Sequence, residues 1–233
     1  MRRLLIRPGA IGDVILSLPA LEAAKAGYTE VWAPRVTLPL IRFADKTRAI
    51  ADTGIDLVGI TGAKCLALET FDEIYSWYGT NRPEFREAVA HLPFTFFPAQ
   101  SLPTTPPRIG VPPANRENLA IIHPYSSSPK KNWPVENFQC VAAQIKNVEW
   151  CIPGKIEDLY QLGCWISTAR GYIGNDSGIS HLAAAVGTPV IAIFISTDPR
   201  IWAPRGDHVT VLENPSVPEV LDRCAQYGVL KPG

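Results

Sequence analysis

The chain has 233 residues, which fits one large domain or two small ones, and its 46% hydrophobic content excludes a disordered chain. Lysine plus arginine and aspartate plus glutamate number 22 each, so no net charge favours nucleic acid or an anionic membrane as partner. An anionic ligand therefore has to be held by local groups.

The five cysteines are scattered, form no CxxC pair, and lie at no zinc-ligand spacing from a histidine. This pattern predicts reduced thiols, no metal site and a cytoplasmic protein. The apolar run at residues 4–6 is too short for a signal peptide or a membrane span, so we expect no transmembrane segment.

The first half of the chain alternates strand-like and helix-like segments. Residues 3–7 are expected to form a buried strand, and apolar positions from Ile11 onward recur at helical spacing until Gly27. Further strands are expected at residues 30–33, 49–51, 57–60, 73–77 and 94–97, with a helix at residues 83–91. This alternation is typical of βαβ units and a parallel sheet.

Six prolines then fall between residues 98 and 113. Prolines at this density remove backbone donors and fix φ, which favours a stiff, extended connector. We place the domain boundary here, with one domain at residues 1–112 and the other at residues 113–233.

The second half of the chain repeats the alternation of strand-like and helix-like segments. Strands are expected at residues 119–122, 148–152, 171–174 and 189–195. Helices are expected at residues 134–146, 156–168, 177–186 and 217–227. The predicted fold class is therefore α/β, with two Rossmann-like lobes that face each other across a cleft and a compact N-terminal lobe.

The first candidate site is the glycine turn that leads from the first strand into the first helix. Gly9 and Gly12 would let the backbone approach a ligand, and the helix N-terminus offers N–H donors. Asp13 has a simpler explanation, because a carboxylate in the first helical turn interacts favourably with the helix dipole. Spacing alone leaves both interpretations open.

The second candidate is the loop at residues 123–134. It contains Ser126, Ser127 and Lys131, and hydroxyl and ammonium groups of this kind suit a diphosphate. The alternative is an ordinary solvated polar loop. The sequence of the loop does not choose between the two.

The third and fourth candidates also follow predicted strands. Asp176 or Ser177 can cap a helix, yet the amides around Gly178 can equally bind an anion, and a helical His181 is usually structural. Thr197 and Asp198 stand before a proline, where a simple Asp-Pro turn is the alternative. All four loops fall at the strand ends where α/β sheets bind ligands.

These motifs together resemble a known family. Residues 10–21, 123–134, 175–185 and 197–199 occur in the order found in the heptosyltransferases of lipopolysaccharide core assembly, glycosyltransferase family 9. The Asp-Ser-Gly-x-x-His-Leu segment at residues 176–182, followed by Thr-Asp-Pro, is the most specific part. The family's Gly-Pro before Thr-Asp-Pro is Ile-Ser at residues 195–196.

The resemblance implies a GT-B fold and a metal-independent, inverting transfer of a heptose-like sugar from a nucleotide-diphosphate sugar, typically ADP-linked, with no other cofactor. Asp13 would be the general base of the N-terminal, acceptor-side domain. The donor-binding residues in the C-terminal domain would be Ser126, Ser127, Lys131, Asp176, Ser177, Gly178 and His181, with Gly12, Thr197 and Asp198 also on the donor side.

The implied partners are the nucleotide-sugar donor and a glycan or lipid-linked acceptor in lipopolysaccharide or cell-surface glycan assembly. Peripheral contact with the inner membrane stays open, and nucleic acid is not expected. The N-terminal lobe is compact for the family. A non-catalytic relative that binds a nucleotide or a partner protein is therefore the alternative.

Overall fold

The computed structural model describes residues 1–60, 62, 65–98, 105–113 and 116–226. The chain divides into two compact units, Met1–Thr105 and Pro106–Gly233, each with its own sheet. The α/β class and the two Rossmann-like units predicted from the sequence are confirmed.

The first unit contains a parallel five-stranded sheet with the order β3-β2-β1-β4-β5. Its strands are β1 (Arg2–Ile6), β2 (Tyr28–Ala33), β3 (Lys46–Ala49), β4 (Glu73–Ser76) and β5 (Phe94–Phe96). Its described helices are α1 (Ile11–Ala23), α2 (Pro83–Ala88) and the 3-10 helices Arg35–Leu40, Ile50–Asp52, Ile55–Leu57 and Leu66–Thr70. All strand pairs are parallel, so the strands end at one common edge.

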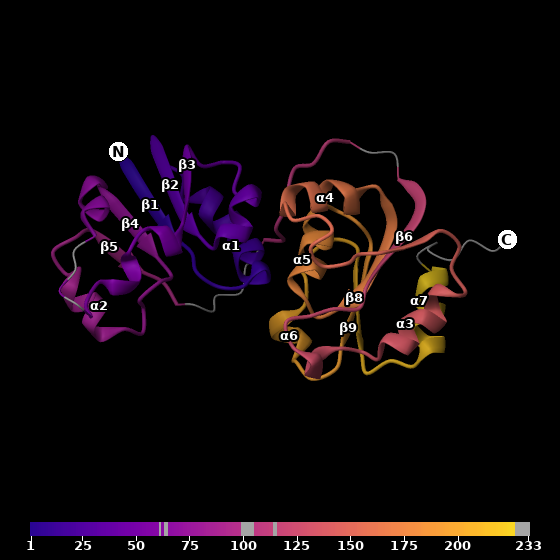
Figure 1. Ribbon diagram of the computed structural model, residues 1–233. Coiled ribbons are helices and arrows are strands. Elements are labelled where there is room, and N and C mark those ends of the chain that lie inside the picture. Colours follow the sequence, from indigo (N-terminus) through magenta and orange to yellow (C-terminus); the bar gives the residue numbers. More distant parts are fainter. Residues whose placement is uncertain (61, 63–64, 99–104, 114–115, 227–233) are drawn as a thin grey trace. The chain divides into compact units, whose positions relative to one another are not determined.

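Both faces of this sheet are covered. Leu4 and Ile6 pack with Trp32 and with Phe85 of α2 in one apolar cluster. Alternation along β1 directs Leu5 to the other face, which α1 covers (Figure 1). The buried positions of α1 are Val14, Ile15, Leu18 and Leu21, which confirms the helical periodicity.

Residues 57–60 do not form a strand of the sheet, so this prediction is wrong. The chain turns here after the 3-10 helix Ile55–Leu57, and Gly59 takes a φ of +82°. A Cβ on Gly59 would lie 2.6 Å from the carbonyl oxygen of Glu84, so the chain can approach α2 this closely only through a glycine. Val58 is buried, which explains the apolar pattern.

The second unit contains a parallel sheet with the order β10-β9-β8-β6-β7. Its strands are β6 (Glu117–His123), β7 (Val148–Trp150), β8 (Ala169–Asn175), β9 (Val190–Phe194) and β10 (Val209–Glu213). Its described helices are α3 (Val135–Ala142), α4 (Leu159–Ser167), α5 (Gly178–Ala185), α6 (Pro199–Trp202), α7 (Val217–Gln226) and the 3-10 helix Pro129–Lys131. Helices α3 and α7 cover one face of the sheet, and α4 and α5 cover the other (Figure 1).

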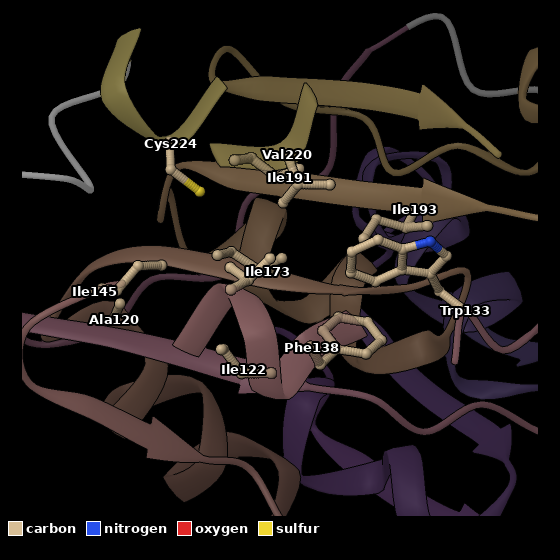
Figure 2. Packing of buried hydrophobic residues seen from close by; sticks show 11 residues of the cluster. Ala120, Ile122, Trp133, Phe138, Ile145, Ile173, Ile191, Ile193, Val220 and Cys224 are labelled. Atoms are coloured by element: carbon tan, nitrogen blue, oxygen red, sulfur yellow. The ribbon is translucent and has the colours of Figure 1, made fainter. Parts of the chain in front are cut away.

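The core of the second unit reaches the carboxyl edge of the sheet. Trp133 lies edge-on against Phe138 of α3, with ring centroids 5.0 Å apart, and both belong with Ile193 of β9 to one buried cluster (Figure 2). The Trp133 Nε1–H donates to the carbonyl oxygen of Pro215 at 3.0 Å, so the buried indole has a polar partner. The end of the loop that precedes α3 is thereby anchored in the core.

The proline-rich stretch belongs partly to the second unit. The buried Ile109 donates its backbone N–H to the carbonyl oxygen of Ala185, at the end of α5. The structure therefore divides the chain at Thr105/Pro106, whereas the sequence places the boundary after residue 112. Residues 99–104 of the predicted connector lie outside the described residues.

Candidate functional site

The second sheet has a topological switch point between β6 and β8. The chain first runs from β6 outward to β7 and then continues from β8 to β10 on the other side. The two central strands end side by side, with His123 opposite Gly174 in the register. Open α/β sheets bind ligands beyond the carboxyl ends of the strands at such a point, so the loops at residues 124–134 and 176–177 border the expected site.

Three loops bring Lys131, Asp176 and Thr197 together there. Lys131 Nζ lies 2.8 Å from Asp176 Oδ2, and Thr197 Oγ1 donates to the same oxygen at 2.7 Å. Asp176 is 5% exposed, whereas the Lys131 side chain keeps 27% of its surface exposed. The carboxylate is buried with an ammonium and a hydroxyl as partners, and in return it holds the ammonium at the edge of the sheet. These three predicted site residues form one cluster.

The loop at residues 124–134 is shaped by its own side chains. Ser126 Oγ lies 2.7 Å from Asn132 Oδ1 and accepts the backbone N–H of Ser128 at 3.2 Å. Ser127 is exposed on the surface of the loop, as is Lys130. The structure therefore gives Ser126 a contact inside the loop and leaves the Ser127 hydroxyl facing solvent.

The N-terminus of α5 lies at the same edge. Ser177 is the N-cap residue, and its Oγ accepts the backbone N–H of Ser180 at 3.3 Å. The first amides of a helix have no intrahelical partner and carry the positive end of the helix dipole, so the backbone N–H groups of Gly178 and Ile179 are donors of the kind that bind anions. His181 is buried in the body of the helix, at 5% exposure.

The structure separates Thr197 from its neighbour Asp198. Asp198 caps α6, accepting the Arg200 N–H at 2.9 Å, and its carboxylate pairs with the Arg200 guanidinium at 2.7 Å. These hydrogen bonds from Arg200 lower the pKa of the Asp198 carboxyl below its ordinary value. Thr197 belongs to the Asp176 cluster, and Asp198 faces its own helix.

Two buried polar residues at this edge were not predicted as site residues. Asn175 is fully buried, and its amide bonds to Pro124 and Trp133, at opposite ends of the loop that carries Lys131. His123 is 4% exposed, and its Nδ1 lies 2.9 Å from the carbonyl oxygen of Cys151. Each is a polar residue that ends a strand directly after a buried stretch, residues 119–122 in β6 and 171–174 in β8, and this is the signal that could have found them.

The imidazole of His123 is neutral at neutral pH. Burial lowers its pKa, and the bond to the Cys151 carbonyl opposes this shift more weakly. Because a carbonyl oxygen only accepts hydrogen bonds, the proton of the neutral ring sits on Nδ1. The ring also lies edge-on to Tyr125, with centroids 5.6 Å apart.

In the first unit, Asp13 occupies the third position of α1 and Gly12 the second. Asp13 Oδ2 accepts the backbone N–H of Ala10 at 2.8 Å, as expected for a carboxylate that caps its own helix. Gly9 has a φ of +119°, and a Cβ there would lie 2.9 Å from this oxygen. The turn thus needs glycine to accommodate the carboxylate.

Arg7 lies beneath this turn, at 5% exposure. Its Nε donates to Ser17 Oγ at 2.6 Å, and Ser17 Oγ donates to the carbonyl oxygen of Asp13 at 2.8 Å. Burial lowers the pKa of the guanidinium, and the charge of Asp13 opposes that shift. The end of β1 and the first turns of α1 therefore form one polar network around Asp13.

Within the described part of the chain, no three His, Cys, Asp or Glu side chains are grouped so that they could hold a metal ion. None of the helices in that part combines the length and apolar character that crossing a bilayer requires.

Part of the second unit is similar to a known protein family. Residues 152–226 match the family model of glycosyltransferase family 9 (heptosyltransferase). Lipopolysaccharide heptosyltransferase 3 of Escherichia coli is 48% identical over 44 residues, a match that covers 19% of this chain and 13% of that protein. The predicted resemblance to family 9 is confirmed by these matches.

Solved heptosyltransferase structures are similar in fold to the whole chain. The structure of E. coli ADP-heptose lps heptosyltransferase II superposes with a TM-score of 0.69 at 15% identity, covering 97% of this chain and 98% of that one. E. coli heptosyltransferase WaaC with ADP gives a TM-score of 0.65 at 15% identity, covering 97% and 100%. At this identity the likeness establishes the fold, which is the two-unit GT-B fold that the sequence predicts.

Proposed function

We propose that this chain is a glycosyltransferase that moves a heptose-like sugar from a nucleotide-diphosphate sugar, ADP-linked, to a hydroxyl of an acceptor. The observation that carries the proposal is the cluster of Lys131, Asp176 and Thr197 beside the N-terminus of α5. It combines a fixed ammonium with helix amides at the switch point of the second sheet, and residues 152–226 of the same unit match the family 9 model.

In the proposed mechanism the pyrophosphate binds at the start of α5. The amides of Gly178 and Ile179 take phosphate oxygens, and Lys131 offsets the negative charge that grows on the diphosphate as it leaves with the electron pair of the glycosidic bond. Asp176 and Thr197 keep the ammonium in place, and the exposed Ser127 hydroxyl contributes a further donor. No metal ion is required for this neutralisation.

Asp13 is proposed as the general base. Oδ2 is held by the Ala10 N–H, and the other carboxylate oxygen accepts the proton of the acceptor hydroxyl as that hydroxyl attacks the anomeric carbon. Attack opposite to the leaving diphosphate inverts the anomeric configuration. The acceptor is a glycan or lipid-linked saccharide of lipopolysaccharide or cell-surface glycan assembly, and the reaction takes place in the cytoplasm.

The binding step is tested by titrating ADP, GDP and UDP into the protein in a calorimeter with EDTA present. Lys131→Ala is expected to weaken diphosphate binding about tenfold to a hundredfold, the usual loss for one charge-assisted hydrogen bond. Lys130→Ala is the matched control, because Lys130 is the exposed neighbour and its removal changes the net charge equally. Equal losses in the two variants, or no binding of any diphosphate, would contradict the proposed donor site.

The transfer step is tested with Asp13→Asn, using ADP-heptose and a panel of acceptors. A lost general base lowers kcat by about 10² to 10⁴ while donor binding is retained. An unchanged kcat excludes Asp13 as the base.

A second candidate function is nucleotide binding without transfer. It is favoured by the bond from the Ala10 N–H to Asp13, since a carboxylate that caps its own helix has a structural use without any reaction. Diphosphate binding in calorimetry, together with no turnover across the acceptor panel, would support this candidate.

A further inference from the structure

One fully buried side chain holds both ends of the loop that carries Lys131. Asn175, the last residue of β8, donates from Nδ2 to the carbonyl oxygen of Pro124 at 2.8 Å, where the loop begins. Its Oδ1 accepts the backbone N–H of Trp133 at 2.9 Å, where the loop ends. Asn175 is 0% exposed, so these bonds are shielded from competition with water.

The same amide also reaches the interior of the loop. Asn175 Nδ2 lies 3.4 Å from Asn132 Oδ1, which in turn lies 2.7 Å from Ser126 Oγ. One side chain thus connects the start, the interior and the end of the loop. Apart from the 3-10 helix Pro129–Lys131, the described loop has no regular structure to keep its shape.

Asn175 and Asp176 are adjacent in the chain and act on the same loop. Asp176 bonds the Lys131 ammonium, and Asn175 bonds the backbone two residues further along, at Trp133. The backbone of Asp176 is itself fixed, because its N–H donates to Ile193 of β9 at 2.9 Å. The position of the ammonium relative to the start of α5 therefore depends on both side chains.

We propose that Asn175 is a positioning residue for pyrophosphate binding, which acts by holding the loop so that the Lys131 ammonium stands at the N-terminus of α5. The inference rests on the proposed function. A preorganised loop does not lose conformational freedom when the ligand binds, so the full charge-assisted contact of Lys131 contributes to affinity.

Asn175→Asp tests this with almost no change in shape. The variant keeps the oxygen that accepts from Trp133 but replaces Nδ2 by an oxygen, which repels the Pro124 carbonyl. ADP affinity is expected to fall tenfold or more in calorimetry, while the affinity for adenosine, which lacks phosphate, stays within about twofold. Asn147→Asp is the matched control, because Asn147 is exposed in the turn before β7, at the opposite edge of the sheet.

A double-mutant cycle with Lys131→Ala separates positioning from the added charge. If Asn175 acts through Lys131, Asn175→Asp adds little further loss of ADP affinity in the Lys131→Ala background. A full additional loss there would mean that the new carboxylate simply repels phosphate, and would overturn the inference. Equal ADP affinity of Asn175→Asp and the unmodified protein would overturn it while leaving the proposed function intact. If the unmodified protein binds no nucleoside diphosphate, both fail together.

Asn132→Ala is a second variant that tests the inference if Asn175→Asp does not fold. Asn132 is half-buried, and its removal breaks the interior contact while adding no charge. We expect a smaller loss of ADP affinity and faster hydrogen exchange at the Trp133 amide. Unchanged affinity and unchanged exchange in this variant would overturn the inference.

Discussion

Gly174 sits immediately before the site residues, and replacing it with alanine tests how tightly the central strands are packed there. A Cβ at Gly174 would lie 2.7 Å from the Tyr172 hydroxyl and 3.0 Å from the carbonyl oxygen of His123 in β6. Neither group has room to yield, since Tyr172 is fully buried and His123 is paired in the sheet. The Tyr172 hydroxyl also lies 3.3 Å from Ser180 Oγ in the first turn of α5, so its displacement disturbs the helix start.

Overpacking of this kind lowers the free energy of unfolding by about 1–3 kcal/mol. The smaller conformational freedom of alanine in the unfolded chain raises it by about 0.4–1 kcal/mol. The net loss of about 1.5 kcal/mol lowers the melting temperature by roughly 6 °C for a unit of this size. Differential scanning calorimetry measures the shift in the transition of the second unit. ADP titration should show weaker binding as well, because the start of α5 moves.

Gly110→Ala is the control for this substitution. Gly110 belongs to the same unit, and no heavy atom lies within 4 Å of the position that its Cβ would take. This variant should be as stable as the unmodified protein, or slightly more stable. If Gly174→Ala melts within about 1 °C of Gly110→Ala, the packing around Gly174 is looser than the distances indicate.

Three further outcomes are expected. Burial lowers the pKa of His123 in the folded protein, so as pH falls below about 6.5 the unfolded chain binds a proton at this residue before the folded protein does, and the free energy of unfolding decreases. Urea unfolding at pH 5 and 7.5 should therefore show a smaller pH dependence of this free energy in His123→Asn than in the unmodified protein. Burial, followed by the hydrogen bond to Asp56, raises the pKa of Tyr78 to about 12, so ultraviolet titration should show a tyrosine step near pH 12 that Asp56→Asn moves to lower pH; the step of the fully buried Tyr172, whose pKa burial raises still further, should not move. Asp158→Ala removes the side chain that caps α4 and should lower the free energy of unfolding by about 1 kcal/mol in urea, whereas a loss near zero would mean that the cap contributes nothing.

The sequence predicts the alternation of strands and helices because buried parallel strands and amphipathic helices leave strong patterns. The prediction fails where contacts between residues distant in the chain determine the backbone conformation. The apolar residues at 57–60 form a turn against α2, and the residues at 209–213 form strand β10, which was not predicted. The helix expected at residues 134–146 ends at Ala142. Of residues 49–51, only Ala49 lies in β3.

The candidate site shows the same division. Charged and hydroxyl groups after strands mark the loops of Lys131, Asp176 and Thr197 in the sequence, and the resemblance to family 9 assigns these residues to the donor site. The structure brings the three together. The contribution of Asn175 depends on bonds to Pro124 and Trp133, more than forty residues away in the chain. No local pattern reveals such contacts, because they exist only once β6 and β8 lie side by side.

The two apolar clusters share no residue: that of Leu4 and Phe85 lies wholly in the first unit, and that of Trp133 and Phe138 lies wholly in the second. Recombination within the proline-rich stretch would therefore join either unit to a unit from another protein without dividing either of these two clusters of described residues. Under the proposed function, the first unit, which selects the acceptor, and the second unit, which selects the donor, can therefore be exchanged independently in evolution.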